Sequence, residues 1–187
     1  YDEMHLYAAF EVADNSPMLN SGKDFALLFK TGDACDLYLA TDPKSDPKRI
    51  RPAASDIRLL FSVLEGQPVC VLYEPVAREG ERATRLFTSP VSAEAFDRVV
   101  LLKEAQVAIQ RTKNGYTLEA SIPLSSIRFI PKAGAIYRGD VGVIYSDTGG
   151  SRNVLRVCYF NKDTAIVNDI PTEVRLQPQN WGMMLVE

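Results

Sequence analysis

Residues 107–122 read VAIQRTKNGYTLEASI, and apolar residues alternate with polar ones on both sides of an Asn-Gly pair. Val107 and Ile109 share one face before this pair, and Leu118 and Ile122 share one face after it. A period of two is the side-chain period of a β-strand, and Asn-Gly favours a tight turn. The stretch therefore predicts an antiparallel hairpin, which Pro123 ends because proline has no N–H for the strand ladder.

The same alternation recurs along much of the chain, in residues 5–12, 35–39, 57–63, 69–73, 141–145 and 155–159. Turn residues at 65–68 and 147–150 separate neighbouring segments, and the faces opposite the apolar ones are only partly polar. Many short strands joined by turns predict an all-β fold, an antiparallel β-sandwich of jelly-roll type. We expect about nine or ten strands and little helix.

Three segments lie outside this simple pattern. Residues 92–104 contain helix formers after an N-cap-like serine, but we expect a loop that leads into a strand near 99–102. Residues 124–127 predict one helical turn, and residues 168–180 predict a long polar loop. Met183 and Leu185 then alternate as core residues of a short terminal strand.

Composition limits the class of protein. The 187 residues are 46% hydrophobic and 24% charged, which fits one globular domain over residues 1–187 with a real core. A strand pattern that starts almost at once indicates a domain cut from a larger multidomain protein. The net charge of -3 argues against nucleic acid as a partner, and no apolar run approaches the roughly 20 residues of a membrane span.

Residues able to catalyse or to hold a metal are scarce. His5 is the only histidine, which argues against Ser-His-Asp and Cys-His catalysis, and three scattered cysteines predict buried thiols rather than a disulfide framework or a zinc site. No cofactor is certain. Structural calcium is the best metal candidate, with Asp140 and Asp147 as ligands, because sandwich loops offer the oxygen atoms that calcium prefers. Haem held by His5 and a methionine is a weaker alternative.

Several motifs, in order along the chain, resemble those of one family. They are residues 5–14 (HLYAAFEVAD), 32–39 (GDACDLYL), 115–123 (GYTLEASIP), 139–143 (GDVGV) and 181–185 (WGMML). Together they resemble family 9 carbohydrate-binding modules and the related DOMON-like domains. The resemblance implies a non-catalytic sugar-binding sandwich, an accessory domain of a secreted bacterial carbohydrate-active or cell-surface protein, and hence an extracellular or periplasmic location.

The resemblance also implies site residues. Family members hold sugar between two tryptophans with a carboxylate and an arginine, and the polar positions correspond to Asp33 or Asp36 and to Arg58. Phe29 would replace one aromatic wall, whereas residues 167–170, at the other wall, contain no aromatic residue. Trp181, the only tryptophan, precedes Gly182 where the family has a structural aromatic, so it is predicted to pack.

Strand alternation extends this set of candidates. Tyr38, Arg156 and Asn161 occupy positions from which polar side chains of neighbouring strands can share one exposed sheet face with Asp36 and Arg58. The first hypothesis is therefore a domain that binds a glycan or polysaccharide. The second is a structural domain that packs against a neighbouring domain of its parent chain through an exposed apolar patch. The third is a haem-binding redox domain.

Overall fold

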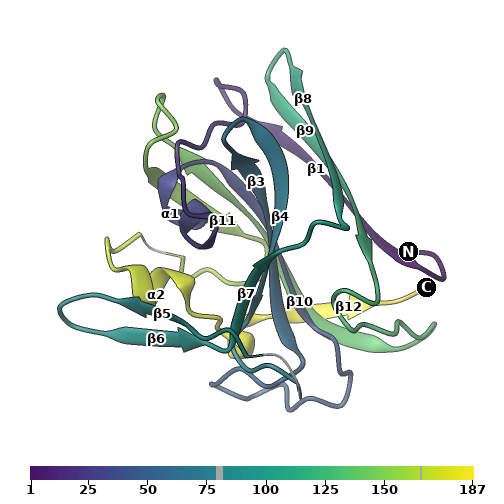
Figure 1. Cartoon of the computed structure of the whole chain (residues 1–187). Coiled ribbons are helices and arrows are strands. Elements are labelled where there is room, and N and C mark those ends of the chain that lie inside the picture. The colour runs from purple at the N-terminus through teal and green to yellow at the C-terminus, as the bar shows by residue number, and fades with distance from the viewer. Residues whose placement is uncertain (79–81, 165) are drawn as a thin grey trace.

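The structure is a computed structural model that describes residues 1–78, 82–164 and 166–187. Its centre is a seven-stranded antiparallel sheet of order β11-β10-β2-β3-β4-β7, in which β12 pairs with part of β10 (Figure 1). The sheet contains β2 (Ala34–Ala40), β3 (Asp56–Leu64), β4 (Gln67–Glu74), β7 (Arg98–Leu101), β10 (Ile136–Ser146), β11 (Asn153–Cys158) and β12 (Gly182–Leu185).

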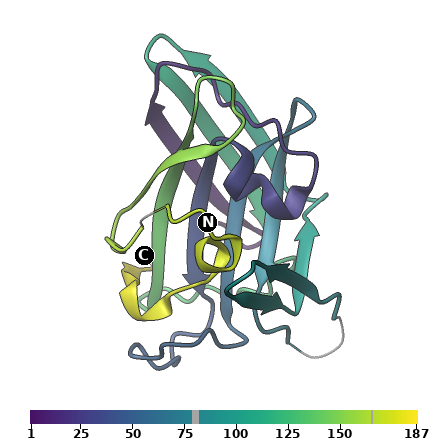
Figure 2. The same ribbon diagram turned by 90° about the vertical axis from the view of Figure 1, so that its left-hand side faces the viewer.

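Two further layers cover this sheet. A three-stranded sheet of order β1-β9-β8 faces one side, and it consists of β1 (His5–Ala13), β8 (Gln106–Thr112) and β9 (Gly115–Pro123). Short helices and a separate hairpin lie over the other side (Figure 2). These are η1 (Phe25–Leu27), α1 (Leu28–Thr31), α2 (Ile170–Val174), η2 (Pro178–Asn180), β5 (Arg85–Thr88) and β6 (Ala93–Phe96).

The layers bury both faces of the large sheet. On β3, Leu59 and Phe61 point into the core beneath the small sheet, whereas Leu60 points into a second core beneath the helices. Because both faces of the sheet are buried, the strand positions opposite the first core are also partly apolar. A sandwich with one wet face would expose those positions, but here they pack against α1, α2 and the β5–β6 hairpin.

The predicted hairpins form as antiparallel strand pairs. In the 107–122 hairpin, Ile109 pairs with Leu118. Gly115 has a φ of 145°, and a Cβ there would lie 1.9 Å from the Val12 carbonyl oxygen, so close strand contact requires glycine. A two-residue turn at Glu65 and Gly66 joins β3 to β4, with φ values of 51° and 79°.

The antiparallel sandwich is confirmed, but several local expectations differ from the structure. Twelve strands are described instead of nine or ten, because β5 and β6 form a hairpin that the strand pattern did not predict. The predicted polar loop at 168–180 contains α2 and η2. Met183 and Leu185 form the predicted terminal strand, yet their exposed fractions are 67% and 60%, so they are not core residues. No helix in the described part of the chain is long and apolar enough to cross a lipid bilayer.

Candidate functional site

The predicted polar pair Asp36 and Arg58 meets on neighbouring strands, on the helix-covered face of the large sheet. Arg58 Nε donates to Asp36 Oδ1 over 2.8 Å, and Arg58 Nη2 donates to Asp36 Oδ2 over 2.9 Å. The Tyr38 hydroxyl donates to the same carboxylate over 3.1 Å. The geometry is bidentate, which is the strongest form of an arginine–carboxylate contact.

Aromatic rings surround the Arg58 guanidinium. Its central carbon lies 5.3 Å from the Phe29 ring centroid, 5.5 Å from that of Tyr38 and 5.2 Å from that of Tyr73. Burial acts to lower the pKa of Arg58, but the Asp36 carboxylate outweighs it and the pKa rises. Burial also raises the pKa of Tyr38, which stays protonated and able to donate.

The pair is closed to solvent. Arg58, Asp36, Phe29 and Asp33 all have an exposed fraction of 0%. Asp33 accepts hydrogen bonds from the backbone N–H groups of residues 19 and 146, so it ties loops together. None of these four residues lines the cavity described next, but Asp36 accepts a hydrogen bond from Tyr38, which does line it. The expectation that Asp36 and Arg58 lie on an exposed sheet face is wrong, because a third layer covers that face.

An enclosed polar cavity of about 100 Å³ lies beside this pair, and Tyr38, Arg156 and Asn161 line it, so the structure brings three predicted residues together. The remaining lining residues are Asp140, Cys158, Asp163, Thr164, Val167, Thr172, Glu173, Arg175, Gln177 and Trp181. Strands β2, β10 and β11, the loop after β11, and α2 with the segment after it therefore contribute to one site.

A hydrogen-bonded rim holds the loop after β11. The Asp140 carboxylate accepts from the backbone N–H groups of Phe160 and Asn161, over 2.9 and 2.7 Å. The Asn161 amide then donates to Gln177 Oε1 over 2.8 Å. These bonds fix the loop against the segment that follows α2.

Helix α2 forms the opposite wall, and sequence reasoning missed its contribution. Asp169 caps it by accepting from the Thr172 N–H, and Pro171 stands in its first turn. Glu173 is buried and accepts from Lys30 Nζ over 2.8 Å, which ties α2 to α1. The sequence did indicate the start of α2, because aspartate followed two residues later by proline, as in Asp169 and Pro171, is typical of a helix start.

Trp181 packs, as predicted, and it also lines the cavity. It is 3% exposed, and its ring centroid lies 6.0 Å from that of Tyr38. The cavity thus combines two aromatic rings with guanidinium, amide and carboxylate groups. Such a lining suits a polar ligand that also has an apolar face.

The predicted calcium ligands are not brought together. Asp140 lies within β10 and faces the cavity rim, whereas Asp147 follows the end of β10 and accepts from Ser151. Seven residues of extended strand span about 23 Å, which no single ion can bridge. The described residues contain no group of three or more His, Cys, Asp or Glu side chains placed to hold a metal ion.

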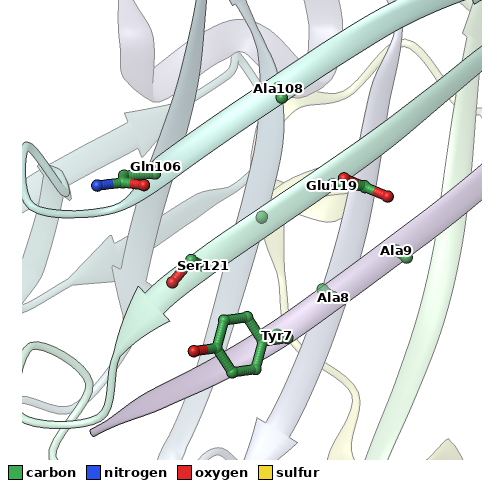
Figure 3. A pocket seen from close by; sticks show the side chains of 8 residues that line it. Tyr7, Ala8, Ala9, Gln106, Ala108, Glu119 and Ser121 are labelled. Atoms are coloured by element: carbon green, nitrogen blue, oxygen red, sulfur yellow. The ribbon is translucent and has the colours of Figure 1, made fainter.

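A second hollow, of about 400 Å³, lies on the outer face of the small sheet (Figure 3). Ala9 and Ala108 leave space between the longer side chains of Tyr7, Gln106 and Glu119 (Figure 3). The Tyr7 hydroxyl already donates to Asp2 over 2.7 Å. The hollow is open and its long side chains are exposed, so it has fewer fixed polar groups than the cavity beside Trp181.

Fold and cavity together define a three-layered β-sandwich domain with a small aromatic and guanidinium-lined pocket. Two solved structures to which this chain is similar are family 9 carbohydrate-binding modules. One from Caldicellulosiruptor kristjanssonii, in complex with cellotriose, has a TM-score of 0.60 and 17% identity over 100% of this chain and 71% of that chain. A complex with glucose from the same organism has a TM-score of 0.57 and 17% identity, over 100% of this chain and 73% of that chain. No protein-family model and no curated protein sequence matches the chain.

Proposed function

We propose that this domain is a non-catalytic carbohydrate-binding module whose ligand site is the cavity lined by Trp181, Tyr38 and Arg156. The observation that carries the proposal is the composition of this cavity, which places aromatic rings beside polar groups held by a fixed network. Aromatic faces cover the apolar surface of a sugar ring, and guanidinium and amide groups bind its oxygen atoms. The similarity in fold to modules solved with cellotriose and with glucose supports it.

The size of the cavity limits how the ligand is held. About 100 Å³ is well below the roughly 300–1,000 Å³ of pockets that enclose a whole small molecule. We therefore propose that one end or one substituent of a saccharide enters, while the rest lies over the rim. As an accessory domain of a secreted bacterial protein, it would keep that larger protein close to a glycan.

Calorimetric titration with a panel of neutral and acidic oligosaccharides tests this function. Val167 lines the rim and is 52% exposed, so Val167→Trp adds an aromatic wall without disturbing the core. We expect the substitution to tighten binding about two- to tenfold, as an additional aromatic contact does. Val154→Trp is the matched control, because Val154 is 50% exposed and lies outside the cavity lining. Absence of binding to every glycan at millimolar concentration would overturn the proposal.

An exposed apolar patch favours a second function, in which the domain packs against a neighbouring domain. Three residues along one face of the edge strand β11 and its extension, Leu155, Val157 and Tyr159, are 51%, 48% and 69% exposed. Leu155 and Val157 pair with Tyr145 and Val143 of β10, and the Tyr159 N–H donates to the Val141 carbonyl oxygen, so the three residues continue the face on which the small sheet packs. This apolar patch favours packing against a neighbouring domain of the parent chain. Val157→Glu should then destabilise the longer protein by at least 1 kcal/mol more than the isolated domain. Equal losses in the two would exclude it.

A further inference from the structure

The Arg156 guanidinium has one edge without a partner. Its Nη1 donates to the Glu173 carbonyl oxygen over 2.8 Å. Its Nε and Nη2 are shielded from solvent and have no hydrogen-bond partner among the described residues. Nε and Nη2 lie along the same edge of the planar group, so two parallel N–H donors lack an acceptor on a residue that lines the cavity.

The same edge of an arginine is satisfied elsewhere in this protein. Arg58 Nε and Nη2 hold the two oxygens of Asp36 over 2.8 and 2.9 Å. A planar carboxylate matches these two donors in spacing and in charge, and a bidentate pair of this kind is stronger than a bond to a neutral oxygen. A shielded, charged donor without an acceptor is also unfavourable.

Two of the three carboxylates that line the cavity, those of Glu173 and Asp140, are engaged by other donors. Glu173 accepts from Lys30 and from Asn153 Nδ2, over 2.8 and 2.7 Å. Asp140 accepts from three backbone N–H groups, those of residues 141, 160 and 161. Asp163 is exposed at the rim. Arg175, the other lining arginine, pairs with Glu94 over 2.7 Å.

We infer that the saccharide bound in this cavity carries a carboxylate, and that Arg156 holds this carboxylate through Nε and Nη2. The inference rests on the proposed function and adds the substrate class, which is an acidic glycan with a terminal or branching uronic acid. A carboxylate is small enough for a cavity of about 100 Å³. The ring that bears it lies over the rim, where it meets the accessible edge of the aromatic wall formed by Trp181 and Tyr38.

Fluorescence titration of the sole tryptophan reports on this cavity directly, because Trp181 lines it. The ligands are glucuronate, glucose and acetate at equal ionic strength, followed by a neutral oligosaccharide and its uronate-bearing counterpart. We expect each uronate to bind at least tenfold more tightly than its neutral analogue. Acetate should bind far more weakly than glucuronate, because it has no ring to contact the aromatic wall.

Arg156→Lys keeps the charge but removes the two-donor edge, so it should abolish most of the preference for the uronate. Arg152→Lys is the matched control, since Arg152 lies on the same hairpin, pairs with Asp147 and is outside the cavity lining. Thermal unfolding verifies that both variants fold.

The outcomes separate the two proposals. Equal binding of uronates and neutral sugars, or a preference that survives Arg156→Lys, overturns the inference and leaves sugar binding intact. Acetate that binds as tightly as glucuronate shows a carboxylate site that does not recognise sugar, which also overturns it. No response to any saccharide overturns the proposed function and the inference together.

Discussion

Arg58→Met tests whether the buried Arg58–Asp36 pair supports the cavity wall. Methionine retains much of the length and apolar contact of the arginine stem but removes the charge. Asp36, which is 0% exposed, would then keep only the Tyr38 hydroxyl of the contacts described above. The variant therefore leaves a buried carboxylate without its cation.

The magnitude follows from the contacts that are lost. Two hydrogen bonds to a charged group contribute about 1.5–3 kcal/mol each, and removal of one partner of a buried pair costs about 3–5 kcal/mol. We expect a loss of about 4 kcal/mol in the free energy of unfolding. For a domain of this size that corresponds to a fall in Tm of about 8–16 °C.

Urea unfolding followed by circular dichroism and by tryptophan fluorescence measures this change. The double variant Asp36→Leu with Arg58→Met removes both charges, and it should recover at least half of the loss because no lone charge remains buried. Arg152→Met is the control. It breaks a 3.7 Å pair with Asp147 in which the arginine side chain is 76% exposed, and it should cost less than about 1 kcal/mol. A single variant within 1 kcal/mol of the wild type, or a double variant as unstable as the single one, would refute the reasoning.

Three further results are expected. In urea unfolding, Gly115→Ala should lower the free energy of unfolding by more than about 1 kcal/mol, because the Cβ of the new alanine would clash with backbone atoms. The loss should exceed that of Gly66→Ala, in which the new Cβ has no neighbour within 4 Å. Hydrogen bonds from serine and threonine side chains lower the pKa of Asp169 to about 2, so its cap on α2 is fully present above about pH 4 and is lost as the pH falls through 2. The protection of the α2 amides, relative to their intrinsic exchange rates, should fall only in that window, and a loss of protection near pH 5 would contradict the prediction. Burial raises the pKa of Cys70 and of Cys158 to about 12, so both thiols should be unreactive in the folded protein. Mass spectrometry should find that iodoacetamide at pH 8 labels the unfolded protein but not the native protein. Fast labelling of the native protein would show that the core opens.

Much of the fold could be read from local patterns. The alternation in residues 107–122 and the turn at Glu65 and Gly66 predicted hairpins that form in register. The prediction that Met183 and Leu185 are core residues is wrong, because alternation shows that two side chains share a face but does not show what covers that face. On β12 both side chains remain mostly exposed, whereas on β3 a layer of helices buries the face that carries Arg58.

The sequence by itself determined the antiparallel strands, their turns and the residue types of the candidate site, because strand period and turn chemistry act over a few neighbouring residues. Only the tertiary structure decided which polar residues line a cavity. Asp36 and Arg58 are buried beneath α1, whose Phe29 ring contacts Arg58, whereas Arg156, Asn161 and Trp181 meet at the cavity with a helix capped by Asp169. The physical reason is that burial depends on contacts between segments more than a hundred residues apart, such as Lys30 with Glu173, and no local period records such contacts.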